Sequence, residues 1–111
     1  MIMQPPAIEA HGLRKRFGTL TAVDGLSFEV RPGEVFGLVG PDGAGKTTTL
    51  RMLAGIMDLD EGASTVAGFD TQTQADSVKR HMAYMSQRFG LYPDLTVAEN
   101  IDFYADMYSV P

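Results

Sequence analysis

The alternation of hydrophobic and polar positions predicts a β-rich beginning. Residues 8–13 and 26–30 alternate apolar and polar side chains, a pattern typical of strands with one buried face. The basic residues 14–18 and the residues 21–25 contain glycine or clustered polar side chains, so we expect turns there. The pattern therefore predicts an edge strand at 8–13 within an antiparallel β element over about residues 7–34.

A different unit follows this element. Residues 31–34 predict a turn, and residues 35–39 form a continuous apolar run of the kind found in buried parallel strands. Residues 48–54 show helical periodicity, and Gly55 stands where a helix C-terminal cap is expected. We therefore predict a strand, a loop and a helix over about residues 35–55.

The next stretch, about residues 63–95, contains shorter elements. The pattern predicts an acidic turn at 58–62, a strand at 63–67, a turn at 68–70, a polar helix at 75–81 and an apolar strand at 82–85. The remainder, which holds Gly90 and Pro93, is predicted to be irregular.

A helix is predicted to start the last region, about residues 96–111. Thr96 with Glu99 three residues later forms a capping box, the signature of a helix N-terminus. Apolar side chains recur behind it at helical spacing and predict a broad apolar face: Val97, Ile101, Phe103, Tyr104 and Tyr108.

The loop between the strand at 35–39 and its helix carries the clearest chemical signal. Residues 40–48 match the pattern of glycine, four residues, glycine, lysine and threonine that binds phosphate. Glycines let successive backbone N–H groups approach phosphate oxygens, Lys46 would contact the β- and γ-phosphates, and Thr47 would offer its hydroxyl to Mg²⁺. A glycine-rich surface turn that carries a lysine is the alternative, and it leaves the flanking strand and helix unexplained.

Composition limits the classes of function. The 111 residues suffice for one small domain, and their fractions of 44% hydrophobic and 21% charged residues are ordinary for a globular protein. The net charge of −5 argues against a nucleic-acid partner and gives no support for binding to an anionic membrane surface. The negative charge of a phosphate ligand must therefore be met locally.

The chain has no cysteine, which excludes disulfides and thiolate metal sites and fits a reducing cytosolic compartment. No apolar run is long enough to span a membrane, and the first residues lack the pattern of a signal peptide.

Several motifs in a fixed order resemble the ATP-binding subunit of ABC transporters, within the branch of drug and multidrug exporters. The resemblance covers nearly the whole chain and rests on residues 13–18, 22–28, 32–48, 84–87 and 91–100. It implies an α/β fold: a three-layer core of the P-loop NTPase type with an N-terminal antiparallel β element, truncated before the later core strands.

The resemblance also implies roles for single residues. Phe17 matches the aromatic residue that stacks on adenine, and Val23 the small apolar residue beside the same base; for both, core packing is the alternative. Gln87 matches a glutamine that approaches Mg²⁺ and the attacking water, where the alternative is a polar strand end. The implied nucleotide-binding loop comprises Gly40, Pro41, Asp42, Gly43, Ala44, Gly45, Lys46, Thr47 and Thr48.

The segment after Gln87 matches the surface that faces the transmembrane subunit in this family. It carries four large apolar residues: Phe89, Leu91, Tyr92 and Leu95. Such residues suit a docking surface, and they equally suit a cover over the edge of the sheet.

The sequence departs from the family pattern in two respects. Asp42 stands where the family most often has asparagine, a change that we expect to be tolerated. The signature motif, the acidic catalytic residues and the switch histidine have no counterpart, and His11 and His81 are expected to be surface histidines. We therefore expect the N-terminal half of a nucleotide-binding domain; a naturally short, complete protein is the alternative.

These expectations combine into a function. We expect the ATP-hydrolysing part of an exporter at the cytoplasmic face of a membrane, with ATP and Mg²⁺ as ligands and Lys46 and Gln87 as catalytic residues. A transmembrane permease and a second nucleotide-binding domain, arranged head to tail, are the expected partners. These 111 residues alone should bind ATP and hydrolyse it poorly. The alternatives are a nucleotide-binding module that regulates without turnover, and a P-loop ATPase outside transport.

Overall fold

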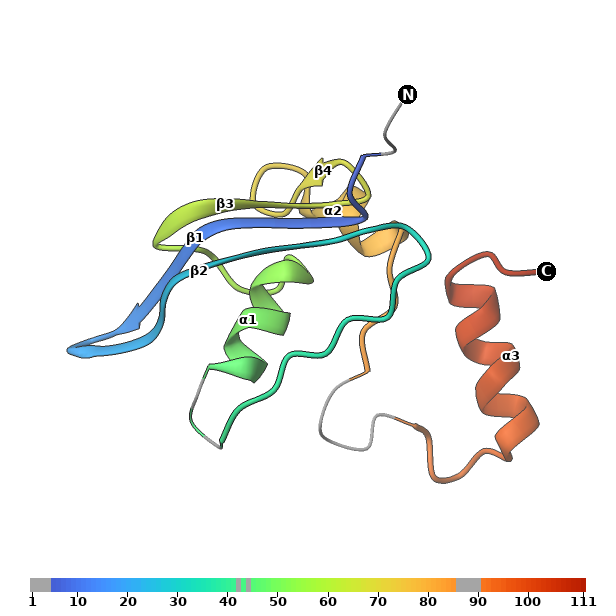
Figure 1. Ribbon diagram of the computed structural model, residues 1–111. Coiled ribbons are helices and arrows are strands. Elements are labelled where there is room, and N and C mark those ends of the chain that lie inside the picture. The colour runs from blue at the N-terminus through green and yellow to red at the C-terminus, as the bar shows by residue number, and fades with distance from the viewer. Residues whose placement is uncertain (1–4, 42, 44, 86–90) are drawn as a thin grey trace.

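A four-stranded antiparallel sheet forms the main part of the molecule (Figure 1). The computed structural model describes residues 5–41, 43, 45–85 and 91–111. The strands are β1 (Ile8–Phe17), β2 (Leu20–Val30), β3 (Glu61–Val66) and β4 (Phe69–Asp70), in the spatial order β2-β1-β3-β4. The predicted α/β class with an antiparallel β element at the N-terminus is confirmed.

The hairpin of β1 and β2 is longer than the sequence pattern predicted. Residues 14–17 continue β1 and residues 21–25 belong to β2, so both predicted turns are wrong and the chain turns only at residues 18–19. Cross-strand pairs such as Arg14 with Asp24 explain the difference, because they hold polar residues in the ladder and register shifts absorb the irregular spacing. Strand β1 is also not an edge strand, since it lies between β2 and β3.

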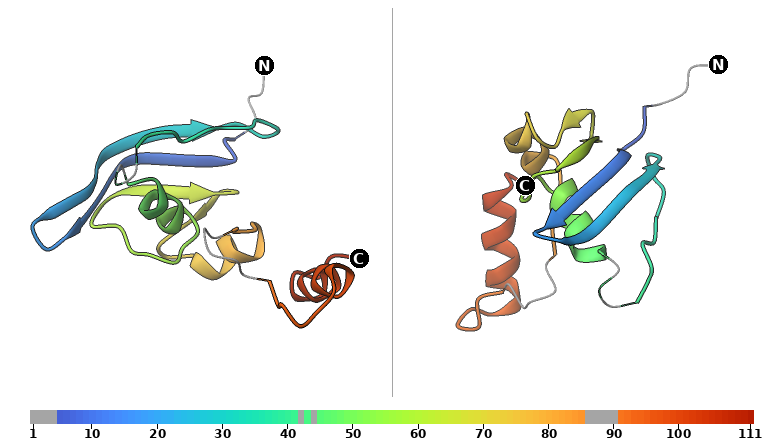
Figure 2. Two further views of the ribbon diagram at one scale, coloured as in Figure 1. Left: turned by 90° about the horizontal axis from the view of Figure 1, so that it is seen from below. Right: turned by 90° about the vertical axis from the view of Figure 1, so that its left-hand side faces the viewer.

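Three helices accompany the sheet: α1 (Lys46–Leu53), α2 (Ala75–Arg80) and α3 (Val97–Met107). Helices α1 and α2 cover one face of the sheet (Figures 1 and 2). The core lies between that face and these two helices, and its buried residues are Ala10, Leu13, Val23, Met52, Leu53, Val66 and Val78. The predicted helices at 48–54 and 75–81 are confirmed, and Gly55 follows α1 with a φ of 73°.

Helix α3 stands apart from the sheet in all three ribbon views (Figures 1 and 2). The predicted capping box is present: the Glu99 N–H donates to the Thr96 hydroxyl at 3.1 Å, and the Thr96 N–H donates to the Glu99 carboxylate at 2.9 Å. Much of its apolar face is open, with Val97 79% and Ile101 62% exposed.

Two predicted strands do not form. Residues 35–39 and 82–85 have no strand pairing among the described residues, and Val35 and Val39 are almost fully exposed. A buried parallel strand needs hydrogen-bonded neighbours in its sheet, and no described strand forms a ladder with either segment. Residue Phe36 instead stacks on Phe28 of β2, with ring centroids 5.1 Å apart.

Candidate functional site: the phosphate-binding loop

The glycine-rich loop leads directly into α1, and Gly45 is the residue that joins them. Gly45 is the N-cap of α1 and has a φ of 87°, a conformation that favours glycine. A Cβ at this position would lie 2.4 Å from the Ala22 carbonyl oxygen and 3.1 Å from a Val23 methyl group. The loop therefore ends against the backbone of β2, at a distance that only glycine permits.

Lys46 closes the loop. Its Nζ donates a hydrogen bond to the Gly40 carbonyl oxygen, so the ammonium group lies over the segment that the sequence predicts to hold phosphate. Gly43, between the two, has a φ of 84°. The predicted residues Asp42 and Ala44 lie outside the described residues, whereas Gly40 and Pro41 are described and exposed.

The N-terminus of α1 is open to an anion. No side chain among the described residues caps it, and its first turn contains no acidic residue, in contrast to the capped N-terminus of α3. Unpaired N–H groups and the helix dipole favour negative charge at such a position. Thr47 is exposed there and Thr48 half-buried, while the Thr49 hydroxyl turns away and donates to the Gly45 carbonyl oxygen at 2.8 Å.

These donors fit a triphosphate with its metal. The loop offers glycine N–H groups, an ammonium group and the exposed hydroxyl of Thr47, which suits a Mg²⁺ ion that is also held by the phosphates. The described residues contain no group of three or more His, Cys, Asp or Glu side chains that could hold a metal without the nucleotide.

The two residues expected beside the base differ in their surroundings. Val23 is 5% exposed and belongs to the core, where it packs beside Gly45 and so supports the loop. Phe17 is 47% exposed at the end of β1, which does not fit its alternative interpretation as a core aromatic residue. Contact of either side chain with the base stays a prediction.

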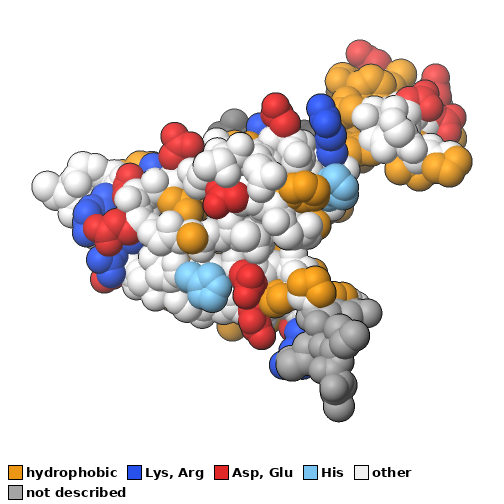
Figure 3. Space-filling model, turned by 90° about the horizontal axis from the view of Figure 1, so that it is seen from above, with side chains coloured by type: hydrophobic (Ala, Val, Ile, Leu, Met, Phe, Trp, Pro, Cys, Tyr) orange, Lys and Arg blue, Asp and Glu red, His pale blue; other side chains and the backbone are white. Residues whose placement is uncertain are grey.

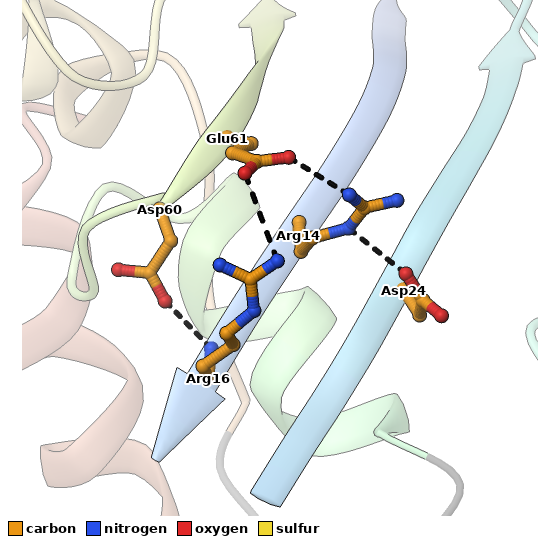
Figure 4. Close-up of polar contacts among 5 residues, drawn as sticks. All are labelled: Arg14, Arg16, Asp24, Asp60 and Glu61. Carbon is orange, nitrogen blue, oxygen red and sulfur yellow. Dashed lines mark hydrogen bonds and ion pairs between the residues drawn. The ribbon is translucent and has the colours of Figure 1, made fainter. Parts of the chain in front are cut away.

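A network of charged residues spans β2, β1 and β3 (Figure 4). Arg14 bridges β2 and β3, because its Nε lies 2.9 Å from an Asp24 oxygen and its Nη1 donates to Glu61 at 2.9 Å. The Arg16 backbone N–H donates to Asp60 at 2.6 Å. Sequence reasoning missed this network, although three consecutive positive charges at residues 14–16 are a signal that could have indicated acidic partners on the neighbouring strands.

The segment after the predicted glutamine lies beside α3 and away from the sheet (Figures 1 and 2). Gln87 and Phe89 lie outside the described residues. Leu91 and Tyr92 are 46% and 47% exposed, which argues against a cover over the sheet edge. With neighbouring side chains they line a hollow of about 470 Å³, formed by Leu91, Tyr92, Pro93, Leu95, Val97, Asn100, Ile101 and Tyr104.

Asn100 shapes this hollow. Its side chain accepts a hydrogen bond from the Tyr92 N–H at 2.9 Å and donates to the carbonyl oxygens of Tyr92, Leu95 and Thr96. The Tyr92 ring meets the Phe103 ring edge to face, at 4.9 Å between centroids. The segment is therefore anchored to α3 while its apolar side chains stay accessible.

A larger cavity of about 750 Å³ lies at the other end of α1. It is bounded by Ala54, Ile56, Lys79, Arg80, His81, Met82, Tyr84, Met107, Tyr108 and Ser109, and none of these belongs to the loop. Figure 3 shows hydrophobic side chains on the part of the molecule that projects at the upper right.

Both histidines, His11 and His81, are exposed, as expected from the sequence.

Residues 23–110 match the family model described as "ABC transporter". The chain belongs to the ABC transporter family. The family binds ATP, so the loop at residues 40–48 occurs in a chain of the ATP-binding type.

Relatives and a solved structure agree with this assignment. The chain is 49% identical over 110 residues to the probable multidrug ABC transporter ATP-binding protein YbhF of Escherichia coli (strain K12), covering 97% of this chain and 19% of that protein. It is 44% identical over 106 residues to the Nod factor export ATP-binding protein I of Ralstonia nicotianae (strain ATCC BAA-1114 / GMI1000), covering 96% of this chain and 33% of that protein. The structure of an ATP-binding subunit of an ABC transporter superposes with a TM-score of 0.83 at 28% identity, over 95% of this chain and 44% of that chain.

The resemblance found in the sequence, including its exporter branch, is thereby confirmed. The chain spans about a fifth to a third of the length of these two relatives. No helix among the described residues is both long and apolar enough to cross a membrane.

Proposed function

We propose that the chain is the nucleotide-binding part of an ABC transporter ATPase, which couples the binding and hydrolysis of MgATP to export across a membrane. The single observation that carries this proposal is the N-terminus of α1, which follows the glycine-rich loop, has no side-chain cap among the described residues and begins with Lys46, whose ammonium group donates to the Gly40 carbonyl oxygen. The names of the exporter-type relatives support the direction of transport.

In this proposal each residue of the loop has one task. The N–H groups of Gly43, Gly45 and the first turn of α1 bind phosphate oxygens, and Lys46 neutralises charge on the β- and γ-phosphates. Thr47 supplies one oxygen ligand to Mg²⁺, and Gln87 orients the metal-bound or attacking water. Phe17 stacks on the adenine base.

Hydrolysis needs more than these residues. Transfer of the γ-phosphoryl group to water requires an oriented water, a base and neutralisation of charge on the far side of the phosphate. We propose that a second nucleotide-binding domain, docked head to tail, supplies the far side. These 111 residues alone then bind ATP but turn it over slowly.

The membrane partner has a proposed docking surface as well. Leu91, Tyr92 and Leu95 are exposed around the hollow beside α3, and Phe89 precedes them in the sequence. An accessible apolar hollow whose rim is hydrogen-bonded through Asn100 suits an inserted apolar side chain of a transmembrane permease. This contact would hold the chain at the cytoplasmic face of the membrane as a peripheral subunit.

Equilibrium binding of MgATP, with phosphate release followed in the same samples, tests the proposal. Lys46→Ala should weaken binding at least tenfold, since it removes a charged contact worth about 1.5–3 kcal/mol. Lys79→Ala is the matched control, because Lys79 is an exposed lysine of α2 outside the loop, and it should bind ATP as the unchanged chain does. Equal affinities of the two variants would contradict the proposal, and rapid phosphate release would contradict slow turnover by this chain alone.

A further inference from the structure

Lys15 lies over the ring of Phe17. The Lys15 Nζ is 5.5 Å from the centroid of the ring, within the range of a cation–π interaction. The Lys15 side chain is only 15% exposed, whereas Phe17 is 47% exposed. The ring therefore has an ammonium group against it and still keeps much of its surface open.

Both side chains lie on the face of the sheet that carries the phosphate-binding loop. The Lys15 ammonium group lies over the Phe17 ring, so the two side chains lie on the same side of β1. Lys15 also pairs across the hairpin with Val23, which is a core residue beside Gly45. The open part of the ring consequently lies on the same side of the sheet as a nucleotide whose phosphates occupy the loop.

Asp60 fixes this arrangement. One of its carboxylate oxygens lies 3.8 Å from the Lys15 Nζ, and the other accepts the hydrogen bond from the Arg16 N–H at 2.6 Å. The Asp60 N–H donates in turn to the Arg14 carbonyl oxygen at 2.9 Å. The ladder between β1 and β3 ends at the pair of Arg14 and Glu61, so Asp60 extends the connection past the last pair. The Lys15 ammonium group is thus held between a carboxylate and the ring.

We propose that Lys15 is a positioning residue for recognition of the nucleotide base, acting through Phe17. The ammonium group orients the ring and draws its electron density toward the covered face. The repulsion between stacked π systems falls when the density of one of them is withdrawn, so the open face binds a purine more strongly. This inference rests on the proposed function.

The test compares a ligand that has a base with one that lacks it. MgATP and magnesium tripolyphosphate should bind the same loop, but only ATP reaches Phe17. Lys15→Met should raise the Kd for MgATP about two- to fivefold, the range that corresponds to an exposed cation–π contact, and leave the Kd for tripolyphosphate unchanged. Lys79→Met makes the same chemical change on α2 and should alter neither Kd.

A double-mutant cycle shows whether Lys15 acts through the ring. In the Phe17→Leu background, Lys15→Met should cause no further loss of ATP affinity, and Lys15→Arg alone, which keeps the cation, should retain affinity. An equal loss for ATP and tripolyphosphate would overturn the inference, because it would indicate a general attraction to the phosphates. The inference would also be overturned if Lys15→Met lowered ATP affinity as much in the Phe17→Leu background as it does in the unchanged chain.

Two further results keep the inference separate from the proposed function. If Lys46→Ala abolishes ATP binding while Lys15→Met binds as the unchanged chain does, only the inference fails; if the unchanged chain binds no ATP, both fail. Should Lys15→Met not fold, Lys15→Gln takes its place, since it also removes the positive charge and keeps a polar group that can donate to Asp60. It should weaken ATP binding and not tripolyphosphate binding, and an unchanged ATP affinity would overturn the inference.

Discussion

At the scale of a single residue, Gly45 has two structural roles. It gives the chain the positive φ with which the loop enters α1, and it lets the Ala22 carbonyl oxygen approach within a distance that no side chain permits. The motif alone indicated that a glycine is needed for the phosphate. The close approach to β2 could not be predicted from the motif, because it depends on a strand more than twenty residues away in the sequence.

Gly45→Ala should therefore destabilise the chain more than an ordinary substitution of a glycine in a turn. We expect a loss of about 2–5 kcal/mol, the sum of backbone strain and a clash with backbone atoms that cannot move independently. Gly33→Ala is the matched control, since Gly33 also has a positive φ, of 78°, but no atom lies within 4 Å of the place that an added methyl group would take. It should lose about 1–2 kcal/mol of strain alone. Urea unfolding of both variants measures the difference, and equal losses would contradict the close approach.

Asp70 gives a second residue-scale prediction, on pH. Backbone N–H groups of Thr73 and Gln72 donate to its carboxylate, at 3.0 and 2.8 Å, and lower the pKa of Asp70 below its ordinary value. A carboxyl group with a lowered pKa in the folded state stabilises the fold above its unfolded pKa, and this contribution is lost as the pH falls through the folded pKa. Asp70→Asn should therefore be less stable than the unchanged chain at pH 7.

The difference in stability between Asp70→Asn and the unchanged chain should shrink as the pH falls below about 4. Urea midpoints measured between about pH 2.5 and 7 test this. A difference that stays constant over this range would show that the charge of Asp70 does not contribute.

At the scale of elements, the sequence predicted structure that depends on neighbouring residues, but it did not predict structure that depends on contacts between distant residues. The N-terminus of α3 was predictable because the capping box of Thr96 and Glu99 lies within four residues of sequence. The second half of β1 was not predictable in the same way, because residues 14–17 stay extended through pairs with β2 and through contacts of Asp60 and Glu61. A polar, basic stretch read alone resembles a turn, and only its partners make it a strand.

Helix α3 depends on its capping box more than a packed helix would, because it stands apart from the sheet (Figure 1). Thr96→Ala removes the hydroxyl that accepts the Glu99 N–H, and should cost about 1 kcal/mol of helix stability. Amide hydrogen exchange should then accelerate about fivefold in the first turn of α3 and stay unchanged in β1.

Thr19→Ala, in the turn between β1 and β2, is the control for this experiment. It makes the same chemical change far from α3 and should leave the exchange of the helix as it is. Exchange in α3 that does not respond to Thr96→Ala would contradict the role of the cap.

At the scale of the whole molecule, the phosphate-binding unit was recognisable but its strand was not formed. The sequence predicted the loop and the helix after it, and both are present. The apolar runs at 35–39 and 82–85 have the composition of buried parallel strands, but a strand of this kind exists only with neighbours on its edges. Their side chains instead add exposed apolar surface, including Val35, Val39 and Met85.

The charge of the whole chain also bears on the site. A net charge of −5 repels an anion at long range, so the loop must attract a nucleotide through short-range contacts. The uncapped N-terminus of α1, with no acidic residue in its first turn, and the Lys46 ammonium group satisfy this requirement among the described residues.

The central claim, that residues 40–48 hold the phosphates of ATP, is tested most directly by two-dimensional amide NMR of the isotope-labelled chain titrated with MgATP. The claim predicts the largest shifts at the N–H groups of Gly43, Gly45, Lys46 and Thr47, and their loss in Lys46→Ala. Shifts confined to the hollow beside α3 or to the cavity at the far end of α1, with the loop unchanged, would contradict it.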